Sequence, residues 1–313
     1  MPLSSQAERG GLTDPCARPG DEGNPHPRPK VIAKENARAI AVPCMVILLV
    51  DTGGWQNLCL AAMEHTHPID PFLQACVDAK ADTVTPAKPE STGHEFEATT
   101  TSGTVTALLT RPAGADCLLV FAHGAGAGMR HEFMETLTAR LANNRIAVFR
   151  YQFPYMEQGL RRPDFQPVLL KTVRSAIAAA GALSDGLPVF AGGKSMGGRM
   201  TSLAAAKEPL SGVQGIIFFG FPLHPAQKPG VERSQHLRAV GVPLLFLQGT
   251  RDKLAPLDLL GPVCQDLPQP TTLQIIEGAD HGFHVLKRSG RSADEVHDEL
   301  ADATRKWLDG LIS

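Results

Sequence analysis

The stretch PVFAGGKSMGGR, residues 188–199, decides the fold prediction. A short apolar run leads into Gly193-x-Ser195-x-Gly197, and residues 196–207 then follow with helical periodicity. A serine on such a sharp strand-to-helix turn stands above the sheet, and small neighbours let the strand and helix backbones approach closely. Free N–H groups at the start of the helix favour negative charge there. The stretch therefore predicts a nucleophile, Ser195, at the end of a buried strand.

Two parts of the sequence resemble nucleotide-binding motifs, but each lacks a glycine that the motif requires. The residues Gly193-Lys194-Ser195 match the end of a phosphate-binding P-loop, but the glycine that this loop needs five residues before Gly193 is a proline. The run GAGAG, residues 124–128, lacks the last glycine of a dinucleotide fingerprint, because position 129 is Met. Neither motif predicts a nucleotide site.

Strands and helices alternate on both sides of this stretch, after an initial hairpin with a Ser-Gly turn. Short apolar strands separated by helices are typical of a parallel sheet that is covered on both faces. The sequence thus predicts an α/β fold, a mostly parallel doubly wound sheet with helices on both faces and ligands at the carboxyl ends of its strands. The expected strands are 95–100, 104–110, 117–124, 146–151, 188–192, 213–220, 242–248 and 272–277, and the expected helices are 131–144, 167–181, 196–207, 256–267 and 293–311.

Two polar residues beyond the nucleophile follow later strands. Asp252 comes four residues after one strand, and His281 follows the last strand, in the run GADHGF. The order serine, aspartate, histidine at strand ends predicts a nucleophile, an orienting acid and a base. Asp252 as a helix cap, His281 as an ordinary loop residue and His284 as a rival base are the alternatives.

An acyl-transfer site also needs backbone donors for an oxyanion. The N–H of Met196, directly after the nucleophile, is one candidate. The glycine-rich loop 123–129 supplies the other, and we expect it to be the N–H of Ala125. His123, at the start of this loop, is interpreted as structural rather than catalytic.

Four separated blocks carry a resemblance to a known family: HGAGAGMRHEFM, RYQFPYMEQG, GGKSMGGRM and GADHGFHVLKRSGR. They resemble the dienelactone-hydrolase-like branch of the α/β-hydrolases, which includes uncharacterised bacterial hydrolases and the hydrolase-like subunit of the NSL complex. The resemblance covers residues 94–313. It implies an α/β-hydrolase fold with Ser195, Asp252 and His281 as the catalytic triad and with Met196 and Ala125 at the oxyanion positions.

The resemblance has one departure. Dienelactone hydrolases proper use a cysteine nucleophile, whereas this chain has Ser195, so dienelactone is not assumed as the substrate. The branch also contains members without demonstrated chemistry.

Charged residues near the predicted strand ends are candidates for binding an anionic part of a substrate. These are Arg130, His131 and Arg199. The alternative is that they form structural ion pairs or lie in solvent. Only about 20 residues separate the strands that end near residue 221 and begin near residue 242, which predicts no cap domain and an open mouth.

Residues 1–93 differ from the rest of the chain. Proline, glycine and charge dominate residues 1–36, and no segment before residue 94 predicts an assembly that buries a core alone. We therefore expect an irregular or disordered N-terminal extension at 1–93 and one α/β-hydrolase domain at 94–313. Met45 and Met63 are alternative start sites within the extension.

Composition excludes several classes of function. The net charge of −2 offers no basic field for nucleic acid, and no apolar window is long enough to cross a membrane, so a cytoplasmic location is expected. The six cysteines lack zinc-ligand spacing and are interpreted as reduced structural thiols, and no metal or other cofactor is implied.

The expected function is a serine hydrolase that cleaves a carboxylic ester or related acyl bond of a small molecule through an acyl-enzyme. The alternatives are a non-catalytic scaffold that binds a protein partner and a small serine peptidase. The oligomeric state is left open.

Overall fold

The computed structural model describes residues 37–42, 45–50 and 90–312. The chain divides into two units, Met1–Thr83 and Val84–Ser313. In the first unit, strand β1 (Ala37–Val42) pairs antiparallel with β2 (Met45–Val50). Each is a six-residue, mainly apolar run, so both are good strand formers inside a segment predicted to be irregular. The disorder predicted for 1–36 lies outside the described residues.

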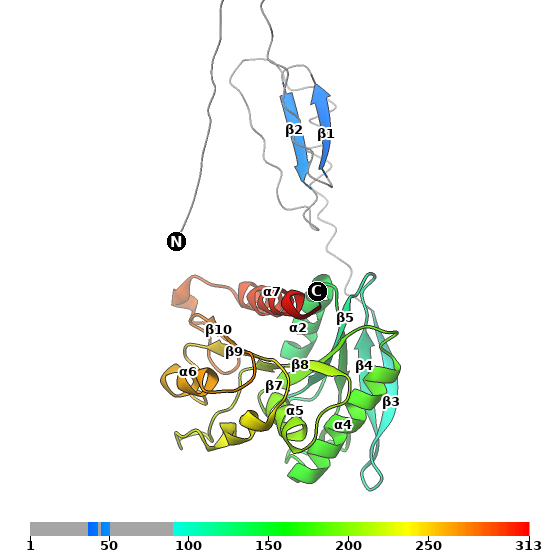
Figure 1. The fold of residues 1–313 in the computed structure, drawn as a ribbon, viewed down its shortest axis with the longest axis vertical. Coiled ribbons are helices and arrows are strands. Elements are labelled where there is room, and N and C mark those ends of the chain that lie inside the picture. Colours follow the sequence, from blue (N-terminus) through cyan, green and yellow to red (C-terminus); the bar gives the residue numbers. More distant parts are fainter. Residues whose placement is uncertain (1–36, 43–44, 51–89, 313) are drawn as a thin grey trace, which may run out of the picture. The chain divides into compact units, whose positions relative to one another are not determined.

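An eight-stranded sheet with the order β10-β9-β8-β7-β5-β6-β4-β3 forms the centre of the second unit (Figure 1). Strands β3 and β4 form the predicted antiparallel hairpin, β4 also runs antiparallel to β6, and the other neighbours are parallel. This confirms the predicted mostly parallel sheet. The bounds are β3 (Ser91–Thr99), β4 (Gly103–Thr110), β5 (Cys117–Ala122), β6 (Ile146–Tyr151), β7 (Val189–Lys194), β8 (Val213–Phe219), β9 (Leu244–Gly249) and β10 (Thr271–Ile276).

Helices cover both faces of this sheet, as predicted (Figure 1). Successive side chains of β5 point to opposite faces: Leu118 and Val120 join a core with α4, α5 and α6, whereas Leu119 and Phe121 join a core with α2 and α7. All six residues of β5 are buried, which explains its continuous apolar sequence. The bounds are α2 (Glu132–Asn143), α4 (Gln166–Ala182), α5 (Met196–Lys207), α6 (Leu257–Gln265) and α7 (Ala293–Ile312).

Three short elements of the second unit were not predicted. Helix α3 (Pro154–Glu157) begins at a proline, which suits the first position of a helix, and spans only four residues. The 3₁₀ helices η1 (Glu232–Ala239) and η2 (Lys287–Ser289) lie in loops after β8 and β10. Since η1 is the one helix described between β8 and β9, no separate cap domain is inserted there.

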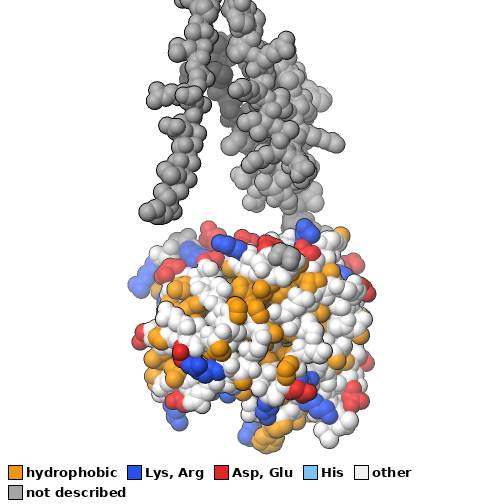
Figure 2. All heavy atoms as spheres, viewed as in Figure 1, with side chains coloured by type: hydrophobic (Ala, Val, Ile, Leu, Met, Phe, Trp, Pro, Cys, Tyr) orange, Lys and Arg blue, Asp and Glu red, His pale blue; other side chains and the backbone are white. Residues whose placement is uncertain are grey.

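The viewed surface is of mixed polarity, and the two described thiols are buried. Figure 2 shows apolar side chains near the middle of the viewed face, with charged side chains of both signs around them. No helix in the described segments is both long and apolar enough to span a membrane. Cys117 and Cys264 are free and buried, and burial raises the pKa of each thiol to about 12. The other four cysteines lie outside the described residues.

Candidate active site

The turn between β7 and α5 holds Ser195 in the left-handed region, with φ 49° and ψ −112°. Main-chain atoms of neighbouring segments lie close to the glycines of this turn. A Cβ added to Gly193 would lie 2.6 Å from the carbonyl oxygen of Ala122 at the end of β5, and one added to Gly197 would lie 2.4 Å from that oxygen. Both distances are shorter than any van der Waals contact, so glycine is required on each side of Ser195. The local packing thus explains the Gly-x-Ser-x-Gly pattern.

Three side chains from three strand ends form one hydrogen-bonded chain. The Oγ of Ser195, after β7, lies 2.8 Å from Nε2 of His281, after β10. The Nδ1 of His281 lies 2.7 Å from Oδ2 of Asp252, after β9. The carboxylate of Asp252 is fully buried, whereas the His281 side chain is 26% exposed. The buried end of the chain is therefore the carboxylate, and the open end is the hydroxyl.

The buried carboxylate is held by two further donors. The backbone N–H of Leu254 donates to Oδ1 of Asp252 at 2.8 Å, and Nε2 of Gln248 donates to Oδ2 at 2.5 Å. Burial acts to raise the pKa of Asp252, but the hydrogen bond and charge of His281 and the Leu254 N–H outweigh it, so the pKa is lowered. Asp252 therefore stays ionised and faces His281. It is not a helix cap, because α6 begins with Pro256 as its cap residue.

Gln248 is a site residue that sequence reasoning missed. Its Nε2 binds Asp252, and its Oε1 accepts from the N–H of Phe221 at 3.0 Å, so both ends of the amide are used. The side chain is fully buried at the end of the strand LLFLQG. A lone polar residue at the carboxyl end of a fully buried strand is the signal that identifies it.

Lys194, directly before Ser195, fixes the main chain of His281. Its Nζ donates to the carbonyl oxygen of His281 at 2.5 Å and lies 5.7 Å from the Phe133 ring centroid and 5.3 Å from that of Phe283. Burial lowers the pKa of Lys194 to about 8, with Asp252 and Asp280 acting in the opposite direction. Lys194 thus ties the turn of Ser195 to the loop of His281.

The alternative base, His284, forms no hydrogen bond with Ser195 among the described residues. Its side chain is 81% exposed, and its Nδ1 lies 3.4 Å from a carboxylate oxygen of Asp280. The same oxygen accepts from the N–H groups of Gly282 and His284, at 2.8 and 2.9 Å. This closes a tight turn around His281, so Asp280 shapes the loop while His281 alone of the two histidines contacts Ser195.

The glycine-rich loop after β5 lies next to Ser195. A Cβ added to Gly124 would come within 3.8 Å of the Cβ of Ser195, so Gly124, directly before Ala125, lies against this residue. Ala125 is exposed, and Met196 opens α5. Within the part of the chain that the structure describes, neither of these two N–H groups donates to another protein group. Both amides are free for a ligand.

Buried side chains hold this loop in place. His123 accepts from the N–H of Phe153 at Nε2 (3.1 Å), so its Nδ1 carries the proton and donates to the carbonyl oxygen of Gly124 (2.8 Å). Burial lowers the pKa of His123 to about 4, which keeps the ring neutral. The hydroxyl oxygen of Tyr155 accepts from the N–H of Gly126 at 3.1 Å. His123 thus has the structural role expected of it.

The three basic residues predicted to bind substrate lie in different settings. Arg130 is exposed in the loop after β5, and His131 caps α2 by accepting from the N–H of Phe133 at 3.2 Å. Arg199 lies in the first turn of α5, where burial and then the nearby Arg233 lower its pKa. The backbone N–H of Arg199 donates to the carbonyl oxygen of Ser195 at 3.1 Å.

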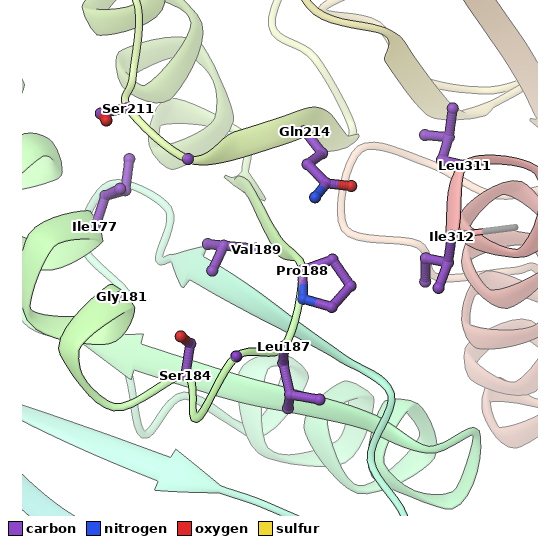
Figure 3. A pocket seen from close by; sticks show the side chains of 12 residues that line it. Ile177, Gly181, Ser184, Leu187, Pro188, Val189, Ser211, Gln214, Leu311 and Ile312 are labelled. Carbon is purple, nitrogen blue, oxygen red and sulfur yellow. The ribbon is translucent and has the colours of Figure 1, made fainter.

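One described pocket lies at the opposite edge of the sheet. Figure 3 shows it around Leu187, Pro188 and Val189 at the start of β7, with Leu311 and Ile312 of α7 on another side. Its volume is about 690 Å³. Ser195 follows the other end of β7, about 20 Å away at the usual rise of a strand. Since the polar chain described above lies at that other end, this pocket is not part of the candidate site.

A family comparison agrees with this arrangement of strands. Residues 115–309 match the sequence model of the family described as the alpha/beta hydrolase domain. The chain belongs to this family. The match spans β5 to α7, and so it contains every strand end that contributes to the candidate site of this alpha/beta hydrolase.

Solved structures similar to this alpha/beta hydrolase share its fold at low identity. A dienelactone hydrolase from Anabaena variabilis is 19% identical with a TM-score of 0.57, over 72% of this chain and 100% of that one. A lidless serine hydrolase from Xanthomonas campestris is 20% identical with a TM-score of 0.55, over 70% and 95%. The esterase domain of a Rhodothermus marinus protein is 18% identical with a TM-score of 0.54, over 72% and 100%.

Proposed function

We propose that this alpha/beta hydrolase cleaves a carboxylic ester or related acyl bond of a small molecule, with Ser195, His281 and Asp252 as its catalytic triad. The observation that carries the proposal is the chain of hydrogen bonds from the part-exposed hydroxyl to the buried carboxylate, at 2.8 and 2.7 Å. A hydroxyl is a weak nucleophile unless an adjacent base takes its proton, and that base needs a partner that fixes its tautomer.

In the first half-reaction, Ser195 Oγ attacks the carbonyl carbon while His281 Nε2 takes the hydroxyl proton. Asp252 holds Nδ1–H of the imidazole and stabilises its positive charge, and the lowered pKa of the carboxyl keeps it ionised. The N–H groups of Met196 and Ala125 bind the oxyanion of the tetrahedral intermediate. Collapse of this intermediate breaks the ester bond, and His281 gives its proton to the leaving alkoxide.

In the second half-reaction, water attacks the acyl-enzyme by the same route. His281 takes a proton from the water, the two amides hold the second oxyanion, and collapse returns the proton to Ser195 Oγ as the acid leaves. All groups used come from this chain. The absence of a cap between β8 and β9, together with the part-exposed His281, favours small or surface-accessible acyl groups.

Two observations favour this function over a non-catalytic scaffold. Gln248 is fully buried, and the two ends of its amide form hydrogen bonds with the proposed catalytic carboxylate and with the loop after β8. The buried amine of Lys194 donates a hydrogen bond to the main-chain carbonyl oxygen of His281. Since buried polar groups are costly, such support serves a function only where the geometry of the three groups matters.

The test is covalent labelling followed by turnover. A fluorophosphonate probe is expected to add once to the wild-type protein and not to Ser195→Ala, as measured by intact mass. Wild-type protein that stays unlabelled, or equal labelling of the variant, would contradict the proposal. A panel of p-nitrophenyl esters and short peptides then separates esterase from peptidase, and turnover of the esters is expected.

A further inference from the structure

The turn that carries His281 holds a strained residue. Phe283, two residues after His281, is buried and has a φ of 65°, in the left-handed region that bulky side chains rarely adopt. Its N–H donates to the carbonyl oxygen of Asp280 at 2.9 Å, which closes the turn around His281. A residue other than glycine keeps such a conformation only where its surroundings hold it. The position of the imidazole therefore depends on what fixes the side chain of Phe283.

Two other elements hold that side chain. The ring of Phe283 stacks on the ring of Phe133 in α2, with the ring centroids 5.6 Å apart and the ring planes inclined by 13°. The Nζ of Lys194, the last residue of β7, lies 5.3 Å from the Phe283 centroid and 5.7 Å from the Phe133 centroid. The ammonium thus lies at nearly equal distances from two stacked rings, and the face of each ring attracts a cation.

The third contact of this ammonium is with His281 itself. Its Nζ donates to the carbonyl oxygen of His281 at 2.5 Å. A Cβ added to Gly220 would lie 3.3 Å from Nζ and 3.6 Å from Cε1 of the His281 ring, so the ammonium and the imidazole lie against the same residue after β8. One cation therefore contacts both the main chain of His281 and the aromatic pair that supports its turn.

The charge of Lys194 is costly where it lies. The residue is 9% exposed, and within the described part of the chain its ammonium forms no ion pair with a carboxylate within 4.0 Å. Burying an unpaired ammonium costs folding free energy, which an apolar side chain of similar length would not. The two ring faces favour a positive charge in particular. The surroundings of Lys194 therefore suit a charged group rather than a long side chain of any kind.

We infer that the ammonium of Lys194 is a positioning group for His281, and that hydrolysis requires the positive charge at this position. By attracting the two rings and binding the main chain of His281, it keeps the strained turn closed and holds Nε2 at 2.8 Å from Oγ of Ser195. Lys194 directly precedes Ser195, so one segment places both the hydroxyl and the base. This inference rests on the proposed function, because it concerns the base of that same site.

Loss of the Lys194 proton is therefore expected to lower activity. The charged and titratable groups that face the ammonium are Asp252 from the loop after β9 and Asp280 and His281 from the loop after β10. The two carboxylates act to raise the pKa of Lys194, but burial outweighs them and lowers it to about 8. The neutral amine still donates to the carbonyl oxygen of His281 but no longer attracts the rings. We expect kcat to fall as the pH rises through about 8.

The test compares the pH profiles of kcat for a neutral p-nitrophenyl ester. Lys194→Met removes the charge at similar length, and Lys194→Arg keeps a charge that does not titrate below about pH 12. Lys207→Met, which removes an exposed charge from the end of α5, is the control. At pH 7, Lys194→Met is expected to lose about tenfold to hundredfold in kcat with KM little changed, because the base and not the substrate is displaced.

The alkaline limb of the profile tests the requirement for charge. Wild type and Lys207→Met are expected to lose activity above about pH 8, whereas Lys194→Met stays uniformly low and Lys194→Arg exceeds it without an alkaline fall up to about pH 10. A kcat of Lys194→Met within about twofold of the control at pH 7, or an alkaline fall in this variant equal to that of wild type, overturns the inference. This comparison decides alone if the larger side chain of Lys194→Arg prevents folding.

Hydrogen exchange separates failure of this inference from failure of the proposed function. The N–H groups of Gly282, Phe283 and His284 are hydrogen-bonded within the turn, so they exchange slowly while it stays closed. Mass spectrometry at pH 7 is expected to show faster exchange of this segment in Lys194→Met than in Lys207→Met. Unchanged exchange overturns the positioning role whether or not the protein hydrolyses esters. Faster exchange in a protein whose wild type shows no turnover overturns only the hydrolase.

Discussion

Replacing the buried carboxylate by an amide, Asp252→Asn, tests the proposed triad most sharply. In the native site Oδ2 of Asp252 lies 2.7 Å from Nδ1 of His281, which forces the proton onto Nδ1 and leaves Nε2 free to accept from Ser195. Oδ1 accepts from the N–H of Leu254 at 2.8 Å, so the amide oxygen of Asn takes that position. The amide nitrogen then faces His281 and donates to Nδ1. This moves the imidazole proton to Nε2, where it blocks the base.

The size of the effect follows from this change of tautomer. In serine hydrolases with the same chain of groups, the amide lowers kcat by about 10⁴, which is about 5.5 kcal/mol of transition-state stabilisation. The amide nitrogen also meets the Nε2 of Gln248, which donates to Oδ2 in the native protein, so two donors face each other. A buried donor left unsatisfied costs about 1–3 kcal/mol of folding free energy.

The assay is steady-state hydrolysis of a p-nitrophenyl ester together with urea unfolding. Asp258→Asn makes the same chemical change in the exposed first turn of α6 and serves as the control. We expect Asp252→Asn to lose about four decades of kcat with KM little changed. A variant that remains folded and keeps kcat within about tenfold of the control would refute the role of Asp252.

Three further predictions concern stability and reactivity. Gly197→Ala is expected to lower the free energy of unfolding by more than about 2 kcal/mol. Gly310→Ala, which has open space around its Cβ in α7, is expected to raise it by about 0.5 kcal/mol. Urea unfolding measures both values, and similar values for the two variants would contradict the packing argument. Lys194 has a folded pKa of about 8, below its unfolded value, so the unfolded chain holds more protons above pH 8. The free energy of unfolding of wild type relative to Lys194→Met should therefore rise by up to about 3 kcal/mol from pH 8 to about 10.5, and a flat or falling difference is the contrary result. Cys117 and Cys264 should resist iodoacetamide at pH 8 until the protein unfolds, as peptide mass spectrometry would reveal, because their pKa values are about 12.

The sheet was predictable because its strands carry unambiguous signals. Strand β5 is buried on both faces and is apolar throughout, and β7 ends in a turn whose glycines are dictated by contact with Ala122. Both features leave a recognisable pattern within a short stretch of sequence. Helix α3 has only one turn and η1 has no apolar periodicity, so neither element leaves a pattern that a sequence window detects.

The candidate site was predictable only in part. Ser195, Asp252 and His281 each lie within a few residues of the end of a strand, so their strand-end positions and order predict that they meet. The hydrogen bonds of Gln248 to Asp252 and to the N–H of Phe221 depend on side-chain directions and on the path of the loop after β8. These contacts depend on loop geometry that no periodicity encodes.

Because β5 approaches the start of α5 closely, the fold requires the glycines of the serine motif whether or not the protein is active. Gly193 and Gly197 are required by their contact with the backbone of Ala122 and not by a substrate. A related protein that had lost hydrolysis would therefore still need both glycines to fold. Gln248 and the carboxylate of Asp252 have the opposite status, because an apolar core would tolerate their replacement once catalysis no longer mattered. Among relatives of this protein, the polar pair behind the histidine is therefore the better marker of retained chemistry than the serine motif itself.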